Sequence, residues 1–353
     1  MDSYSESISH DQPDDQPQDR PNNQIKERWV VIHKFRTIGD AIFHMHAFHA
    51  IAAVAPQHRI VLAMPGSHPS ADLFVDDPAI EKVVFIARNA RFRWGRIKNI
   101  SVLRQEHFSR VWILGRSTSY AMTALCAGIK ERLGYGIRWP ERICLTRRLY
   151  RPMPRPIPTE VPKMSWAFLE TYGIERLPDG QKPVFTQTRL QQAYDQYADL
   201  PRPWIVFGIG ASHAHRRWPS TCWVTLADAL VQQWGGGGTL FLCGGEQDRG
   251  TASYIASSLT TKPSIVYLIG EHLSVIASIL QHAYVFVGND SGLFHLAGAM
   301  NTCPVVGLFG VSPVFTYLPN ALQIAPPRGI SSSMHALTPY YVTQQILQHC
   351  QFI

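Results

Sequence analysis

The chain lacks any segment typical of a membrane span or an export signal. No stretch of its 353 residues approaches the roughly 20 consecutive apolar residues that cross a bilayer. The first residues also lack the basic stretch followed by an apolar stretch that opens a signal peptide. We therefore expect a protein that stays in the cytosol.

Common metal and nucleotide motifs are absent as well. The six cysteines form no Cys-x-x-Cys pair, and no Asp-x-Asp pair occurs to hold a sugar nucleotide through a metal. None of the lysines directly follows a glycine, which excludes a phosphate-binding P-loop. His44, His46 and His49 lack the i, i+4 spacing of helical zinc ligands. We expect free thiols, no metal and no cofactor.

Charge is distributed unevenly along the chain. Residues 1–24 carry six acids against one base and no apolar periodicity, which predicts a disordered acidic tail. Basic residues concentrate between Arg88 and Arg110 and again between Arg132 and Arg155. Such an arginine-rich surface suits the phosphates or carboxylates of a lipid headgroup or an anionic sugar. A solvated basic face is the alternative, and no nucleic-acid-binding motif accompanies these runs.

The length and the 45% apolar content allow two hydrophobic cores. Strand patterns alternate with helical ones, which indicates parallel sheets. We expect strands at residues 29–35, 59–64, 82–86, 110–114, 204–210, 239–243, 264–269, 285–287 and 304–309.

The alternating pattern starts again near residue 204, after a Pro-rich stretch and a polar connector. We predict an α/β protein with two doubly wound, Rossmann-like domains that face each other across a cleft, at residues 25–180 and 181–335. Residues 336–353 are expected to form a C-terminal helix, for which packing back on the N-terminal domain is one arrangement.

The most informative junction is the run from Val285 to Ala297, in which a strand pattern stops at Asp290-Ser291-Gly292 and a helix starts at once. It places a carboxylate, a hydroxyl and unpaired backbone amides at the carboxyl end of a strand, where α/β sheets bind ligands. This predicts a site for a phosphate-bearing ligand. Simple capping of the helix by Asp290 or Ser291 is the alternative.

Asp40 lies at the corresponding junction after the first strand. Its carboxylate could take a proton from an acceptor hydroxyl. Capping of the helix is the alternative role. Because a helix N-terminus stabilises a charged carboxylate and weakens it as a base, we expect Asp40 to act through its position and not through a high pKa.

Two further loops follow strands of the second half. The small-residue loop from Gly208 to Pro219 contains Arg216 and Arg217, which could hold a pyrophosphate without a metal. His213 replaces the third glycine of a dinucleotide site, and surface ion pairs are the alternative for the arginines. Glu246, after another strand, suits ribose hydroxyls or a plain turn.

Taken together, these segments resemble glycosyltransferase family 9, the bacterial heptosyltransferases of the lipopolysaccharide inner core. The ordered motifs that carry the resemblance are Thr37–Asp40, Gly210–Ser212 with Arg216–Pro219, Gly244–Glu246, and Gly288–Gly292 with His295–Ala297. Similarity extends to residues 47–56, Gly134-Tyr135 and Leu308–Gly310, so that it spans roughly residues 29–320.

The resemblance implies a GT-B architecture and an inverting, metal-independent transfer of heptose from an ADP-sugar to a lipopolysaccharide-core saccharide. It implies that Asp40 is the general base. The implied donor-binding residues are Gly39, Ser212, Arg216, Glu246, Asp290, Ser291, Gly292, Leu293 and His295. Together with the basic clusters, it suggests that Arg88, Arg91, Arg93 and Arg138 bind an anionic acceptor, with peripheral contact at the inner face of the inner membrane. A sugar-nucleotide 2-epimerase-like enzyme and a non-catalytic nucleotide-sugar-binding protein remain alternatives.

Overall fold

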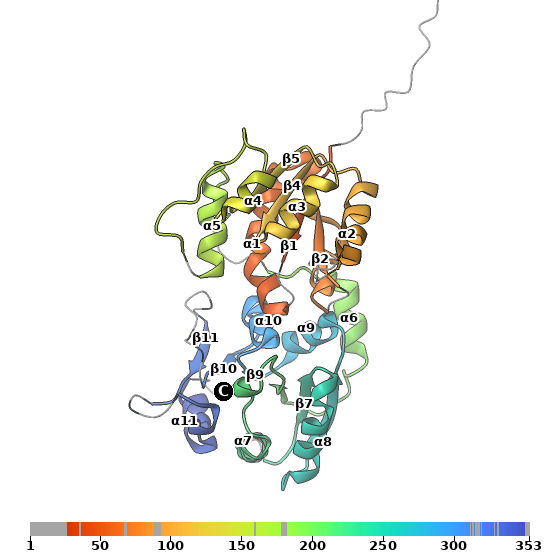
Figure 1. Ribbon diagram of the computed structural model, residues 1–353. Coiled ribbons are helices and arrows are strands. Elements are labelled where there is room, and N and C mark those ends of the chain that lie inside the picture. Colours follow the sequence, from red (N-terminus) through yellow and green to blue (C-terminus); the bar gives the residue numbers. More distant parts are fainter. Residues whose placement is uncertain are drawn as a thin grey trace, which may run out of the picture.

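The protein folds into two parallel-sheet halves stacked one on the other (Figure 1). The structure is a computed structural model. It describes residues 27–349 apart from positions 35–36, 67–68, 88–92, 159, 178–181, 234, 311, 313, 315–317, 319, 328 and 330–331. The expected acidic tail, residues 1–24, lies outside the described residues.

The first half is a five-stranded sheet with the order β3-β2-β1-β4-β5, in which every neighbouring pair is parallel. Its strands are β1 Trp29–His33, β2 Ile60–Pro65, β3 Ile80–Ile86, β4 Arg110–Leu114 and β5 Glu131–Gly134. Its helices are α1 Ile38–Val54, α2 Arg93–Gln105, α3 Thr118–Cys126, α4 Trp139–Cys144 and α5 Val161–Glu170, with the short 3-10 helices η1 Pro56–His58 and η2 Pro69–Phe74. In the apolar core, α1 and α5 cover one face of this sheet, and α2, α3 and α4 cover the other.

The second half is a six-stranded parallel sheet with the order β11-β10-β9-β6-β7-β8. Its strands are β6 Trp204–Gly208, β7 Thr239–Gly244, β8 Ser264–Ile269, β9 Val285–Asn289, β10 Val305–Leu308 and β11 Ala321–Ile324. Its helices are α6 Gln187–Asp195, α7 Ser220–Gln233, α8 Arg249–Ser258, α9 Leu273–His282, α10 Gly292–Met300 and α11 Pro339–His349, with the 3-10 helices η3 Ala214–Arg216, η4 Glu246–Asp248 and η5 Met334–Ala336. None of the helices in the described ranges is long and apolar enough to span a bilayer.

The predicted α/β class is confirmed, and the differences lie at the edges of the sheets. The strands β5 and β11, which the pattern did not indicate, are both four-residue edge strands. The arrangement that packs the C-terminal helix on the N-terminal domain is wrong. Val342 and Ile346 of α11 are buried in the core beside α7 of the second half, because their apolar stripe has its partner there.

Ion pairs hold the halves together along one side of their boundary. The linker helix α6 carries Arg189, whose two terminal nitrogens lie 2.7 Å from Asp72 Oδ1 and 2.8 Å from Asp76 Oδ2 of the first half. Arg189 also donates to Ser274 Oγ of α9 at 3.0 Å. The helix that connects the sheets is therefore tied to both of them.

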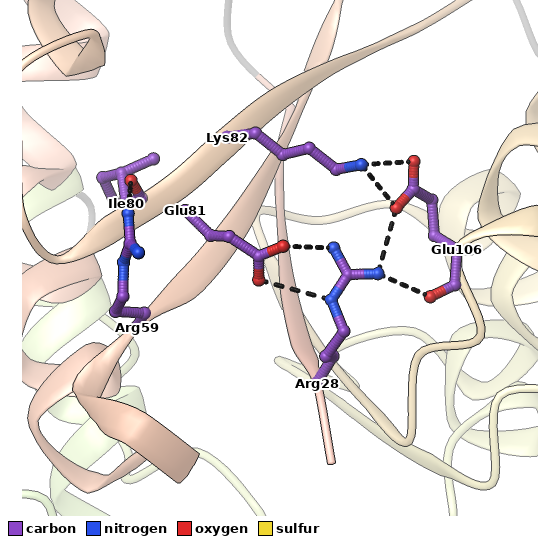
Figure 2. Close-up of polar contacts among 6 residues, drawn as sticks. All are labelled: Arg28, Arg59, Ile80, Glu81, Lys82 and Glu106. Carbon is purple, nitrogen blue, oxygen red and sulfur yellow. Dashed lines mark hydrogen bonds and ion pairs between the residues drawn. The ribbon is translucent and has the colours of Figure 1, made fainter. Parts of the chain in front are cut away.

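A second ion-pair network stabilises the amino ends of the strands, at the edge of the first sheet away from the second half. Figure 2 shows Arg28 between Glu81 and Glu106, with Lys82 also reaching Glu106. Burial acts to raise the pKa of Glu106, but the hydrogen bonds from Lys82 and Arg28 outweigh it and lower the pKa. Glu81 and Glu106 are thus engaged in ion pairs at the amino edge of the sheet.

Candidate functional site

Asp40 lies in the first turn of α1, directly beyond the carboxyl end of β1. Thr37 is the N-cap: its hydroxyl accepts the Asp40 N–H at 3.1 Å and donates to Asp40 Oδ2 at 2.7 Å. The alternative that Asp40 itself caps the helix is therefore wrong. Thr37 performs that role and fixes the orientation of the Asp40 carboxylate.

The expectation for the basicity of Asp40 is also wrong in direction. Burial at the boundary between the halves raises the pKa of Asp40, although its bonds to Thr37 and the charge of Arg216 act to lower it. The partial removal of this carboxylate from water outweighs those favourable interactions. A raised pKa makes this carboxylate a better proton acceptor than an ordinary aspartate.

Buried imidazoles support the first turn of α1. His44 Nδ1 lies 2.9 Å from the Asp40 carbonyl oxygen and 3.2 Å from His33 Nε2. Burial lowers the pKa of His44 to about 4, so the ring is neutral near pH 7. Across the described ranges, no three His, Cys, Asp or Glu side chains gather as a metal ion would require.

Asp290 follows β9 and is 2% exposed. Its Oδ2 lies 3.1 Å from Nη1 of Arg216, which comes from the loop after β6. Ser291 occupies the N-cap position of α10, but its side chain makes no capping bond. The amides in the first turn of α10 lack acceptors within the helix and remain suited to an anion.

His295 lies one turn into α10, with Nε2 3.8 Å from Asp290 Oδ1. Burial, and secondly the charge of Arg216, lower the pKa of His295 to about 3. The ring is therefore neutral near pH 7. It can donate one hydrogen bond, but it adds no positive charge to the site.

Arg216 and Arg217 have different surroundings. Arg217 pairs with Asp248, which is 1% exposed, and donates to the carbonyl of Ala211 at 2.9 Å. The alternative that these arginines form surface ion pairs is wrong, because the carboxylate partner of each one is buried. Arg217 holds the loop after β6 against the end of β7, whereas Arg216 pairs with Asp290 and its charge acts on Asp40 of the first half.

Asn289 is a buried positioning residue that the sequence reasoning missed. Its side chain accepts the Trp218 N–H at 3.1 Å and donates to the Ile209 carbonyl at 2.7 Å. These two hydrogen bonds attach both ends of the arginine-containing loop to the end of β9. The signal was the asparagine directly before the Asp290-Ser291 pair.

The starts of α1 and α10 approach each other closely across the boundary. A Cβ added to Gly39 would lie 2.6 Å from His295 Cδ2, and one added to Gly292 would lie 2.7 Å from Ile38 Cβ. The ring of Phe43 contacts His295 with centroids 4.7 Å apart. Glycine at both positions lets the two helix starts meet, which brings Asp40, Asp290 and Arg216 to one place.

The other expected donor residues lie along the same edge of the second sheet. Ser212 is exposed in the loop after β6, and Glu246 is exposed after β7, where it pairs with Arg249 at 2.8 Å. Because neighbouring strands are about 4.8 Å apart, the ends of β9 and β7 are separated by about 10 Å. This row suits an extended ligand.

A cavity of about 340 Å³ continues the row at the boundary between the halves. It is lined by Pro69, Ala71, Asp72 and Val75 of the first half and by Gly270, Glu271, His272 and Leu273 of the second. Its Gly270 lies against Glu246, whose Oε1 would be 2.6 Å from an added Cβ. Glu246 is therefore next to a space large enough for a planar ring system.

The expected acceptor residues are only partly described. Arg88 and Arg91 lie outside the described residues, as does the side chain of Arg93. Arg138 is exposed at the N-cap of α4.

Lys34 and Arg116, which the sequence pattern did not single out, follow β1 and β4 at the same sheet edge and are exposed. Lys34 donates to the Arg116 carbonyl at 2.9 Å. Their position directly after strands was the available signal.

Two parallel α/β halves with candidate site residues at the facing ends of their strands define a GT-B-type fold. The sequence profile of glycosyltransferase family 9 (heptosyltransferase) matches residues 96–329. The chain belongs to this family.

Individual relatives agree with that assignment. Lipopolysaccharide heptosyltransferase 2 of Escherichia coli K12 is 27% identical over 241 residues, which cover 61% of this chain and 63% of that protein. The chain thus spans less than two thirds of this relative's length.

Two solved structures share the fold. The glycosyltransferase family 9 structure from Veillonella parvula has a TM-score of 0.74 and 18% identity and covers 92% of this chain and 97% of that one. The structure of E. coli ADP-heptose lipopolysaccharide heptosyltransferase II has a TM-score of 0.71 and 22% identity and covers 92% and 98%.

Proposed function

We propose that this protein is an inverting, metal-independent heptosyltransferase that moves a heptose from an ADP-sugar to a lipopolysaccharide-core saccharide or a similar acceptor. The observation that carries the proposal is the meeting of Asp40 with Arg216 and Asp290 across the boundary between the halves. Membership of the family and the ADP-heptose named for the E. coli structure support the donor.

The donor would lie along the carboxyl edge of the second sheet. Arg216, Ser212 and the amides of Gly292 and Leu293 would hold the diphosphate. Glu246 would accept hydrogen bonds from the ribose, and the adenine ring would lie in the adjoining cavity. Ser291 would contact the nucleoside, Asp290 the heptose hydroxyls, and the neutral His295 would donate to the pyrophosphate. Gly39 would provide the space that lets His295 reach this position.

The transfer step needs one base and one anion-stabilising group. The Asp40 carboxylate takes the proton of the acceptor hydroxyl, whose oxygen forms a bond to the anomeric carbon from the face opposite the leaving group. The bond from that carbon to the β-phosphate oxygen breaks, and its electron pair leaves with ADP. Arg216 and the α10 amides stabilise the growing negative charge, so that no divalent cation is needed.

Arg216 has a second consequence for donor binding. Its guanidinium pairs with the buried Asp290. A diphosphate would attract the guanidinium and release Asp290 to accept hydrogen bonds from the sugar. The same arginine then couples occupation of the phosphate site to readiness of the sugar site.

The acceptor would bind to the first half. Arg138, with Arg88, Arg91 and Arg93 along the chain, would contact its phosphates or carboxylates, and Lys34 and Arg116 add charge at the same edge. An acceptor carried by an anionic lipid would place the protein in peripheral contact with the inner face of the inner membrane.

The deciding experiment measures heptose transfer from ADP-heptose to a lipid A core acceptor by the parent chain and by Asp40→Asn. We expect the variant to lose about 10²- to 10⁴-fold in kcat, the usual contribution of a general base. Its thermal stability should not fall, because the asparagine keeps an acceptor for Thr37 and removes a charge whose burial raises the pKa of Asp40.

Asp199→Asn, at an exposed carboxylate, is the matched control and should keep full activity. Equal turnover by Asp40→Asn and the parent would exclude Asp40 as the base. Thermal stabilisation by ADP without transfer to any acceptor would favour the non-catalytic binding protein. Interconversion of sugar nucleotides with no acceptor present would favour the epimerase.

A further inference from the structure

Two tryptophans on the surface of the first half are largely exposed to solvent. Trp94 of α2 is 83% exposed and Trp139 of α4 is 70% exposed. One turn further along each helix, Ile97 and Ile143 are also exposed. Large apolar side chains that are exposed on two helices of one layer indicate a surface that contacts a partner or a membrane.

These side chains lie on one layer of the fold. The helices α2, α3 and α4 cover the same face of the first sheet, with α3 between the other two (Figure 1). We name their exposed outer surface the aromatic-basic face, and define it as Trp94, Ile97 and Lys98 of α2 with Trp139, Arg142 and Ile143 of α4. Because packed helices lie 8–10 Å apart, the two tryptophans flank a surface about 20 Å wide.

The charge around this face has one sign. Residues 93–155 contain 14 lysines and arginines against three glutamates. Glu106 is paired with Arg28 and Lys82 at the amino edge of the sheet (Figure 2), and Glu131 is paired with Arg110. Glu141 is the acidic residue within α2, α3 and α4, and it is fully buried. The three helices therefore present cations to solvent with no exposed carboxylate among them.

We propose that the aromatic-basic face docks on an anionic phospholipid bilayer. Tryptophan favours the boundary between headgroups and acyl chains, and burial of isoleucine on the apolar side of that boundary is favourable in free energy. Lysine and arginine stems follow the apolar surface while their charges reach the lipid phosphates. An acidic protein partner would complement the positive charge of this face, but it would not require tryptophans at two separated points.

The position of this face would bring a lipid-borne acceptor to the Asp40 site, an inference that rests on the proposed function. The helices α2 and α4 begin beyond the carboxyl ends of β3 and β5, at the same edge of the sheet from which α1 begins with Asp40. A bilayer against this face would lie beside the entrance to the Asp40 site. Sugar carried on a lipid would then reach the carboxylate without leaving the membrane.

The test uses the full chain and phospholipid vesicles alone. We expect the parent to sediment with vesicles of phosphatidylethanolamine and phosphatidylglycerol, and to bind weakly to phosphatidylcholine vesicles. Trp94→Ala with Trp139→Ala should weaken the binding to the anionic vesicles by about tenfold or more. Lys98→Glu changes the charge of the face by two units. It should weaken binding to the anionic vesicles by about fivefold for each unit at low salt.

Matched controls come from the second half. Tyr340→Ala removes an aromatic side chain that is equally exposed, on α11, and Lys262→Glu reverses an exposed charge after α8. Both should bind vesicles as the parent does. Brominated acyl chains should quench tryptophan fluorescence of the parent, and should quench that of the double tryptophan variant much less.

Failure to bind anionic vesicles, or equal binding by the double variant and Tyr340→Ala, would overturn the proposal and leave this face to a protein partner. Failure of the proposed function is a separate result, because vesicle binding needs no sugar transfer. The double variant should also keep its transfer to a delipidated saccharide acceptor and lose transfer to a vesicle-bound one.

Discussion

The carboxyl edges of the two sheets hold their charges in opposite ways. On the second sheet, Asp248, Asn289 and Asp290 are buried and each contacts a loop that crosses the edge. On the first sheet, Arg116 and Arg138 are exposed at the surface. The edge proposed for a small nucleotide-sugar is thus held in place by buried side-chain contacts, whereas the edge proposed for a large anionic acceptor presents exposed positive charges.

Removal of Arg217 should have the largest effect on the second edge. Arg217→Gln leaves Asp248 buried without a cation, which should lower the free energy of unfolding by about 3 kcal/mol. Arg249→Gln is the control, because its partner Glu246 is exposed and such pairs contribute about 0–1 kcal/mol. Urea unfolding measures both. Similar small losses would show that the second edge is not held by its buried pair.

The sequence predicted those features that depend on neighbouring residues. The alternation of strands and helices defined both sheets, and the junctions after β1, β6 and β9 located Asp40, Arg216 and Asp290 at strand ends. Two parallel sheets whose carboxyl ends face each other then bring such junctions together.

Features that depend on distant partners could not be predicted. The fold brings Arg217 to Asp248, which lies 31 residues away in the sequence. The residues next to Arg217 and Arg216 do not show which of the two arginines has this partner. The raised pKa of Asp40 comes from burial that the second half helps to create, whereas local reasoning saw only the helix N-terminus. The edge strands β5 and β11 are short and half-polar, so their pattern did not stand out.

The contact between the halves can be tested through Gly39. An alanine Cβ there would press on His295, so Gly39→Ala should separate the starts of α1 and α10 and cost about 1–3 kcal/mol of stability. Gly250→Ala in α8 is the control, because no atom lies within 4 Å of the added Cβ and alanine favours a helix. Thermal unfolding that is unchanged in Gly39→Ala would show that the two helix starts do not depend on close contact.

Acidification should weaken both halves through their buried histidines. His44 of the first half and His295 at the boundary have pKa values of about 4 and 3, below the ordinary value of 6.5. A lowered pKa means that the unfolded chain binds protons first, so the stabilisation is complete above pH 6.5 and is lost as the pH falls toward 4. Each histidine should contribute a slope of up to about 1.4 kcal/mol per pH unit. Urea unfolding between pH 7 and pH 5 measures this slope, and His295→Gln should reduce it by one histidine's share. A slope that His295→Gln leaves unchanged would show that His295 is not held neutral at the boundary, and would remove the reason for assigning it an uncharged role beside Asp290.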